Sequence, residues 1–493
     1  MADMQSASTE DLAILGNELV VALLEEIAGS IRIVEGRVEV VDPETLRSRG
    51  IDRLVHAAVF SPDLDVRDSA RWIIGEAAAE MGIVPASIHE LYIARGRGEV
   101  SGFTVPAMNI RAATWDTGRA LFAAARKLEV GALICEIARS EIGYTDQRPA
   151  EYVAVITAAA LKEGWSGPLF IQGDHFQINA KKYAADPEPE LRAVKDLIHE
   201  AITAGFYNID VDTSTLVDLS KDTLPGQQET NFSLSADLTA FIRRLEPRGV
   251  TISVGGEIGE VGTENSTPEE LRVYMTGFNT VLKELGGKTG RELPGLSKIS
   301  VQSGTSHGGV VLPDGSIAEV AIDFETLRSL SEIARREFHL GGAVQHGAST
   351  LPQTAFGKFP EIETAEIHLA TNFQNMLFDH PALPVELRER MYEHCRTAFP
   401  EERKPTDTEQ QFLYKARKKA IGVFKRELWE LPEERRAEIR QTLSQQFAYL
   451  FEQLRVAGTG KVVAAHVPVT RISRSGPSVL RGKAAADDWD LSD

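Results

Sequence analysis

An aspartate and a histidine stand side by side at the end of an apolar run in this sequence. The stretch FIQGDHFQIN, residues 170–179, carries them as Asp174 and His175. A carboxylate can take up or return a proton, and an imidazole can do the same or bind a metal ion. The pair therefore indicates either half of a reacting site or a strand end that carries two polar residues.

Four more residues suited to metal or proton chemistry follow other apolar runs. They are Glu257 in GGEIGEVG, His307 in SGTSHGG, His346 in VQHGAST and His368 in EIHLATN. A lone histidine near a strand end is more often a hydrogen-bonded structural residue than a ligand. Three such histidines with a carboxylate nearby suit Zn²⁺ and similar divalent ions, with one coordination position left for substrate. The residues alone leave both interpretations open.

The elements that would position these residues have the rhythm of a parallel α/β fold, in which short runs rich in Val and Ile alternate with helical stretches. The runs are FTVPAMN, ALICEIA, PLFIQGD, YNIDVD, TISVGGE, KISVQSG, GGAVQH and AEIHLAT. The eight runs span about residues 103–375. Eight strands over such a span are typical of a (β/α)8 barrel of roughly 250 residues. We therefore predict an α/β fold, a (β/α)8 TIM barrel over residues 84–378, whose strand ends meet at one mouth.

The segments outside the barrel have other patterns. Residues 1–83 predict a mainly helical N-terminal extension in which VEGRVEVVD could form a hairpin. Residues 379–466 predict a C-terminal helical extension. Residues 467–493 have little apolar content and no periodicity, so we expect a mobile tail there.

Composition limits the class of partner. The chain has 72 acidic and 53 basic side chains and a formal charge of -19, which argues against nucleic acid or an anionic membrane surface as the main partner. Two cysteines are too few for a disulfide framework, and the acidic N-terminus does not resemble a signal peptide. We expect a cytoplasmic metabolic protein.

The ordered set of motifs resembles the class II, metal-dependent fructose-bisphosphate aldolase family and its ketose-bisphosphate relatives over about residues 85–425. The matching stretches are IHELYIARGRGEVSGFTVPAMNI, FIQGDHFQ, AGFYNIDVDTSTL, ETNFSLSADL, GGEIGEVG, SGTSHGG, QHGAST and TEQQFLYKARKKAI. No single motif is specific to this family, whereas the whole set in this order is. The resemblance implies a lyase that cleaves or forms a carbon–carbon bond in a ketose or ketose phosphate through a zinc-stabilised enediolate.

The resemblance also implies roles for individual residues. His175, His307 and His346 would bind zinc or another divalent ion, and Glu257 would hold the metal in a second position. Asp174 would exchange a proton with the aldehyde half of the substrate. A monovalent cation is a candidate additional cofactor, and a homodimer or homotetramer is the implied assembly.

The chemistry agrees with the scarcity of lysine at the strand ends. A divalent ion that spreads the negative charge of an enediolate removes the need for a Schiff base. Lys181 and Lys182 lie in a loop beyond His175, and Lys298 begins a strand, so we expect Lys298 at the face opposite the mouth.

Several positions depart from the family pattern. Val311 stands where the family has a phosphate-binding Lys, and the strand-eight Asn and the Asp after it are absent from His368-Leu369-Ala370-Thr371-Asn372. Thr371 remains as in the family, and Asn372 follows it as a further candidate for substrate binding. His368 could donate a hydrogen bond to the enediolate oxygen in place of the Asn.

Substrate recognition would then rest on a changed set of contacts. Gly308 and Ser349 remain where backbone and hydroxyl contacts to phosphate are expected. Arg139, in EIARSEIGYTDQRP, could replace the missing Lys charge or could form a surface ion pair. We therefore expect a substrate other than fructose 1,6-bisphosphate.

Two other functions stay open. The stretch EIARSEIGYTDQRPAEY loosely resembles the non-catalytic companion subunits of tagatose-bisphosphate aldolases, which share the barrel. The set of histidines with Glu257 favours catalysis over that role. Another metal-dependent barrel enzyme, a hydrolase or an epimerase, fits the same ligands.

Overall fold

The computed structural model describes residues 17–259, 264–304, 312 and 322–480. Its centre is a closed barrel of eight parallel strands in the order β4-β5-β6-β7-β8-β9-β10-β11, with β11 paired to β4. The strands are β4 (Val105–Asn109), β5 (Ile134–Ala138), β6 (Gly167–Gln177), β7 (Asn208–Asp212), β8 (Ser253–Glu257), β9 (Lys298–Val301), β10 (Ala343–Gln345) and β11 (Glu366–Leu369). All eight predicted runs form strands, and the predicted barrel is confirmed.

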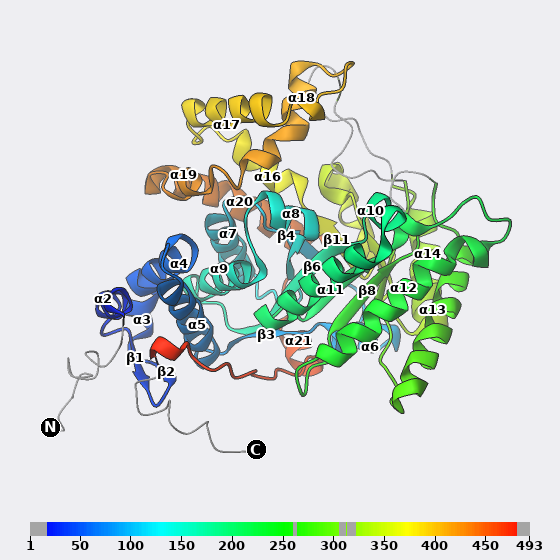
Figure 1. The fold of residues 1–493 in the computed structure, drawn as a ribbon, viewed down its shortest axis with the longest axis horizontal. Helices are drawn as coiled ribbons and strands as arrows, with labels where there is room; N and C mark the ends of the chain where they lie inside the picture. The colour runs from blue at the N-terminus through cyan, green and yellow to red at the C-terminus, as the bar shows by residue number, and fades with distance from the viewer. Residues whose placement is uncertain (1–16, 260–263, 305–311, 313–321, 481–493) are drawn as a thin grey trace.

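Helices surround the barrel, and the first of them, α6, lies at the amino ends of the strands (Figure 1). They are α6 (His89–Gly96), α7 (Thr114–Lys127), α8 (Arg139–Tyr144), α9 (Pro149–Lys162), α10 (Ala180–Ala185), α11 (Pro187–Ala204), α12 (Leu224–Leu245), α13 (Pro268–Thr289), α14 (Phe324–Phe338), α15 (Lys358–Glu361) and α16 (Thr371–Phe378). Among the described residues, no helix combines the length and the apolar character that crossing a membrane requires.

The N-terminal extension packs on one flank of the barrel, where α4 (Ile51–Phe60) and α5 (Leu64–Glu80) lie against α9 (Figure 1). It also contains α2 (Glu18–Glu26), the short α3 (Pro43–Thr45), and an antiparallel hairpin of β1 (Ile31–Val34) and β2 (Arg37–Val40). The sequence did not predict β3 (Ile83–Ala86), which pairs with residues 167–170 of β6 outside the closed barrel. A four-residue run that contains Pro85 does not read as a strand, and the edge position tolerates the missing amide proton.

The C-terminal extension lies over another part of the barrel. It comprises α17 (Val385–Ala398), α18 (Glu409–Ala416), α19 (Lys425–Trp429), α20 (Glu433–Gln453) and α21 (Gly460–His466), and α20 packs along α7. Residues 467–480, here called the C-terminal strap, then cross to the N-terminal extension (Figure 1). The strap belongs to the segment expected as a tail, and its Arg474 carbonyl accepts a hydrogen bond from Trp72 Nε1 at 3.0 Å.

Strand β6 contains a bulge at the point where the Asp-His pair occurs. The pairing with β7 shifts register between Gly173 and Phe176, and His175 has a φ of +41°, in the left-handed region. A bulge breaks the alternation of side chains between the two faces of a strand. Consecutive residues Asp174 and His175 can therefore both face the barrel mouth.

Gly173 makes this bulge possible. A Cβ built on Gly173 would lie 2.5 Å from ring carbons of Phe176, and Phe176 is fully buried. Gly173→Ala should lower the free energy of unfolding by about 1–3 kcal/mol, because the buried ring has no room to shift. Chemical denaturation of the purified variant measures this loss.

Gly75→Ala is the matched control. Gly75 lies inside α5, where an added Cβ has no atom within 4 Å. Its substitution should leave stability unchanged or raise it by up to about 1 kcal/mol through helix propensity. Equal destabilisation by the two substitutions would contradict a special role for Gly173.

Candidate active site

Three of the residues singled out in the sequence converge at the carboxyl ends of the strands. His175, Glu257 and His346 each offer a ligand atom, and these atoms lie within 4.8 Å of one another. His175 Nδ1 lies 3.4 Å from Glu257 Oε2, and His346 Nδ1 lies 3.8 Å from Glu257 Oε1. The fourth expected ligand, His307, lies outside the described residues.

The charges around His175 fit a bound cation. Burial lowers the pKa of His175, but the carboxylates of Asp174, Asp212 and Glu257 outweigh burial and raise that pKa well above its ordinary value. Three carboxylates that face one imidazole create a site where positive charge is favourable, either as an added proton or as a metal ion. Two imidazoles and a carboxylate are also a donor set that divalent ions such as Zn²⁺ accept.

Asp212 is a residue that the sequence analysis missed. Its Oδ2 lies 2.9 Å from His175 Nδ1, and its Oδ1 accepts hydrogen bonds from the backbone and side chain of Ser214. A carboxylate that receives the Nδ1 proton of a histidine fixes the ring and leaves Nε2 for a ligand. Asp212 therefore orients His175 from outside the candidate metal centre.

Asp174 lies in the middle of three imidazoles. Its Oδ1 is 3.2 Å from His368 Nδ1, 3.7 Å from His175 Nε2 and 4.0 Å from His346 Nε2. Burial raises the pKa of Asp174, but these imidazoles outweigh burial and hold that pKa well below its usual range. The carboxylate is thus ionised and stands directly beside the candidate metal ligands.

His368 lies below the mouth, between carboxylates. Its Nε2 is 2.7 Å from Glu366 Oε1, and its Nδ1 is 3.1 Å from Glu136 Oε2. Burial lowers the pKa of His368, but Glu136 and Asp174 outweigh burial and raise that pKa well above its ordinary value. His368 is therefore a buried imidazolium whose two nitrogens face acidic groups, one of which is Asp174.

Lys298 lies one layer deeper, on the side of the barrel away from the mouth, and the sequence analysis did not foresee that its side chain points inward. It begins β9, yet its long side chain reaches into the barrel, where Nζ lies 2.5 Å from Glu366 Oε1 and 2.9 Å from Asp210 Oδ1. Burial lowers the pKa of Lys298, but these two carboxylates outweigh burial and raise that pKa. A lysine held in the charged form is a poor nucleophile for Schiff-base chemistry.

The buried network extends to the amino ends of the strands, where the Tyr92 hydroxyl, from α6, donates to Glu366 Oε2. Gly255 makes room for the network, because a Cβ there would lie 2.3 Å from Asp210 Oδ1. The sequence analysis missed these interior residues. Their signal is the alternation of charged residues within strands, as in NIDVD and EIHL, since residues two apart share one face.

The proposed substrate-binding residues are less closely grouped. Arg139 Nη1 lies 2.5 Å from Glu190 Oε1 and donates to the Gln177 carbonyl, so its charge is already paired. Ser349 Oγ accepts from the amides of Ala370 and Thr371 at 2.6 and 3.2 Å, at the start of α16. Asn372 follows in the first turn of α16. Gly308 and Val311 lie outside the described residues.

A parallel barrel with a buried His, Glu and Asp centre at its strand ends is the architecture of a barrel enzyme with a candidate metal site. The family model described as "Fructose-bisphosphate aldolase class-II" matches residues 97–431. The chain belongs to this family. Among curated proteins, no sequence matches the chain.

Solved structures resemble the chain at low sequence identity. The fructose-bisphosphate aldolase from Campylobacter jejuni is 16% identical over 76% of this chain and 97% of its own, with a TM-score of 0.46. The YdjI aldolase from Escherichia coli K12 is 16% identical over 71% and 99%, with a TM-score of 0.38. The fructuronate-tagaturonate epimerase UxaE from Cohnella laeviribosi is 12% identical over 88% and 90%, with a TM-score of 0.50.

The interior charges give a prediction about stability. Lys298→Met should lower the free energy of unfolding by about 3–5 kcal/mol, because Glu366 and Asp210 would keep their buried charges without a cation. Lys195→Met is the matched control, since Lys195 pairs with Asp237 at 2.7 Å on the surface and should cost less than about 1 kcal/mol. Denaturation curves of the two variants test this, and equal losses would contradict the buried ion-pair network.

Proposed function

We propose that the chain is a metal-dependent lyase that cleaves or forms a carbon–carbon bond in a ketose or ketose phosphate. The observation that carries the proposal is the convergence of His175, Glu257 and His346 beside Asp174, in a chain that belongs to the class II aldolase family. His307 would complete the ligand set. Zinc is the proposed ion, and when bound it would act as a Lewis acid that offsets negative charge on the substrate oxygens.

The protein groups around the centre would handle the protons. Asp174 would take a proton from the substrate hydroxyl that becomes the aldehyde oxygen, and would return it in the reverse direction. His368, 3.2 Å from Asp174, would place positive charge beside that carboxylate and support its ionised form. Asp212 would keep the His175 ring in its orientation.

An anionic substrate is supported by two basic side chains, Arg111 and Lys418, whose charges act on each other, and the charge of Arg111 also interacts with that of Asp174. Arg111 follows β4 by two residues and pairs with Glu141, and the negative charges of Glu141 and Asp174 help to raise its pKa despite its burial. Lys418 Nζ lies 5.8 Å from the Tyr144 ring centroid. Within the described part of the chain, no carboxylate lies within ion-pair distance of Lys418.

The other proposed substrate contacts would act together with Arg111 and Lys418. Thr371 and Asn372 lie in the first turn of α16. Ser349 faces that helix start, and its hydroxyl oxygen already accepts from the amides of Ala370 and Thr371, so a substrate contact there would come from the hydroxyl groups and the Asn372 side chain. Arg139 would have to exchange Glu190 for the substrate before it could contribute charge. With Val311 in place of a Lys, we infer a preferred substrate other than fructose 1,6-bisphosphate. The proposed setting is a cytoplasmic homodimer or homotetramer, a state that light scattering of the purified protein would measure.

An epimerase is the second candidate. The solved epimerase structure aligns with 88% of this chain, whereas the Campylobacter jejuni aldolase aligns with 76%. Epimerisation by breaking and remaking one carbon–carbon bond would need the same metal ligands and the same proton carrier. A released aldehyde that an added dehydrogenase can reduce indicates a lyase, whereas an epimeric ketose with no free aldehyde indicates the second candidate.

The main test compares two substitutions in a screen of ketose phosphates, free ketoses and acidic sugars. Asp174→Asn should retain about one divalent ion per chain and lower turnover roughly a hundredfold or more, the usual scale for a positioned acid/base. His346→Ala should lose most of the ion and the activity together. Elemental analysis and steady-state assays measure both quantities.

The control for this test is metal addition. Excess zinc should not restore the activity of Asp174→Asn. If Asp174→Asn loses the ion and regains a normal rate when zinc is added, Asp174 is a ligand and not the proton carrier. Fructose 1,6-bisphosphate as the best substrate by kcat/KM would contradict the inference about substrate.

Lys418 provides a separate test of substrate charge. Lys418→Met should raise KM for an anionic substrate about tenfold with little change in kcat, because a charged contact is lost. Lys419→Met is the control, since Lys419 is already paired with Glu402. A neutral substrate should not distinguish the two variants, and an equal effect of both substitutions on KM would remove Lys418 from the binding site.

A further inference from the structure

The imidazole of His368 lies between three acidic side chains inside the barrel. Its Nε2 lies 2.7 Å from Glu366 Oε1, which fixes one edge of the ring. The other edge faces two acids, because Nδ1 lies 3.1 Å from Glu136 Oε2 and 3.2 Å from Asp174 Oδ1. A single N–H thus faces two carboxylates at nearly equal distances.

Neither of these two carboxylates holds the N–H firmly. Among the described residues, neither His368 Nδ1 nor Asp174 Oδ1 makes a hydrogen bond of normal geometry, although both side chains are buried. A hydrogen bond weakens steeply as its angle bends. A small tilt of the His368 ring would therefore decide which carboxylate accepts the N–H.

Glu136 is held in place by the neighbouring strand. It lies on β5 directly across from Gln172 on β6, and both side chains are fully buried. Gln172 Nε2 donates to Glu136 Oε2 and to Glu366 Oε1, each at 3.0 Å. Lys298 Nζ donates to Gln172 Oε1 at 2.7 Å, which fixes the orientation of the amide. The amide of Gln172 therefore holds one glutamate at each nitrogen of the His368 ring.

We propose that Glu136 is a positioning residue that acts on Asp174 through His368. The inference rests on the proposed role of Asp174 as the proton carrier. While Asp174 is ionised, it competes with Glu136 for the His368 Nδ1–H. When Asp174 takes the proton of the substrate hydroxyl, its negative charge is lost and Nδ1–H donates to Glu136 instead. His368 keeps its own proton throughout, so one proton passes from the substrate to Asp174, and the reverse step returns it.

The negative charge of Glu136 is what this arrangement requires. Without it, the imidazolium of His368 would have the Asp174 carboxylate as its one charged acceptor at Nδ1. A carboxylate that accepts a charge-assisted hydrogen bond from an imidazolium is a weaker base toward a third group. Glu136 therefore keeps Asp174 available to the substrate.

The first test is Glu136→Gln, which removes the charge and keeps the size of the side chain. It should lower kcat about tenfold or more, leave KM within about twofold and retain the metal ion, because a hydrogen bond to a charged group is lost. Asp116→Asn is the matched control, since Asp116 is a buried carboxylate that pairs with Arg440 outside the barrel. It should leave kcat and KM unchanged. Steady-state assays with the best substrate of the screen measure both constants.

His368→Asn distinguishes positioning from structural support. In a chain that carries His368→Asn, the further change Glu136→Gln should alter kcat less than about twofold, because the path through the imidazole is gone. Loss of kcat by the same factor with and without His368, or no loss in the chain that retains His368, would overturn the proposal.

A second double-mutant cycle, measured by chemical denaturation, needs no activity. The loss of stability on combining His368→Asn with Glu136→Gln should be smaller than the sum of the single losses, and the same should hold for His368→Asn with Asp174→Asn. Additive losses for either pair would show that Nδ1–H belongs to one carboxylate alone and would overturn the inference. Coupling in both pairs without turnover of any ketose would instead contradict the proposed function, so the two failures are distinct.

Discussion

Buried charge in the barrel interior is the constraint on which the candidate active site depends. Four carboxylates and two cations, Lys298 and His368, occupy the space between the amino ends of the strands and the mouth. An unpaired ion in such a place costs several kcal/mol, so each carboxylate must face a cation or hold a proton. Burial and the charge of Asp174 raise the pKa of Glu136 to about 7, despite the opposing charge of His368, which indicates that one of these acids is partly protonated near neutral pH.

This network connects the amino ends of the strands to the reacting groups at the mouth of the barrel. Glu366 receives Lys298 and Tyr92 from below and faces His368 above, and His368 in turn faces Asp174. The position and charge of the proposed proton carrier are thus set by groups that never reach the mouth. Such support from beneath is how a rigid scaffold holds reacting groups in a fixed geometry.

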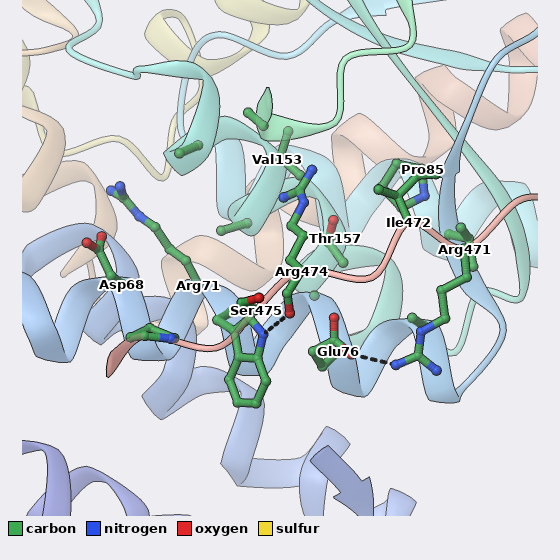
Figure 2. Close-up of a pocket in the computed structure, with 18 of the residues that line it drawn as sticks. Asp68, Arg71, Glu76, Pro85, Val153, Thr157, Arg471, Ile472, Arg474 and Ser475 are labelled. Atoms are coloured by element: carbon green, nitrogen blue, oxygen red, sulfur yellow. Dashed lines mark hydrogen bonds and ion pairs between the residues drawn. The ribbon is translucent and has the colours of Figure 1, made fainter. Parts of the chain in front are cut away.

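The bulge in β6 and the segments that pack outside the barrel also shape the structure around the candidate active site. The bulge in β6 turns two consecutive residues toward the same side, which a regular strand cannot do. The N-terminal extension and the strap pack outside the barrel and create a separate cavity beneath Trp72 (Figure 2). The region around the candidate active site is polar and deeply buried, whereas the wall of the cavity beneath Trp72 is mostly apolar.

The sequence alone determined the barrel and much of the candidate metal centre. Eight apolar runs predicted all eight barrel strands, and His175, Glu257 and His346 were predicted to meet because parallel strands end at one mouth. The periodicity of a strand and the polar residue at its end are both encoded in a few neighbouring residues, so the sequence alone is enough to predict them. Only the tertiary structure showed that the Lys298 side chain crosses the interior, that Arg139 is paired with Glu190, and that the strap packs against Trp72. These outcomes depend on which distant side chain lies opposite, and contacts between segments far apart in the chain leave no pattern in the local sequence.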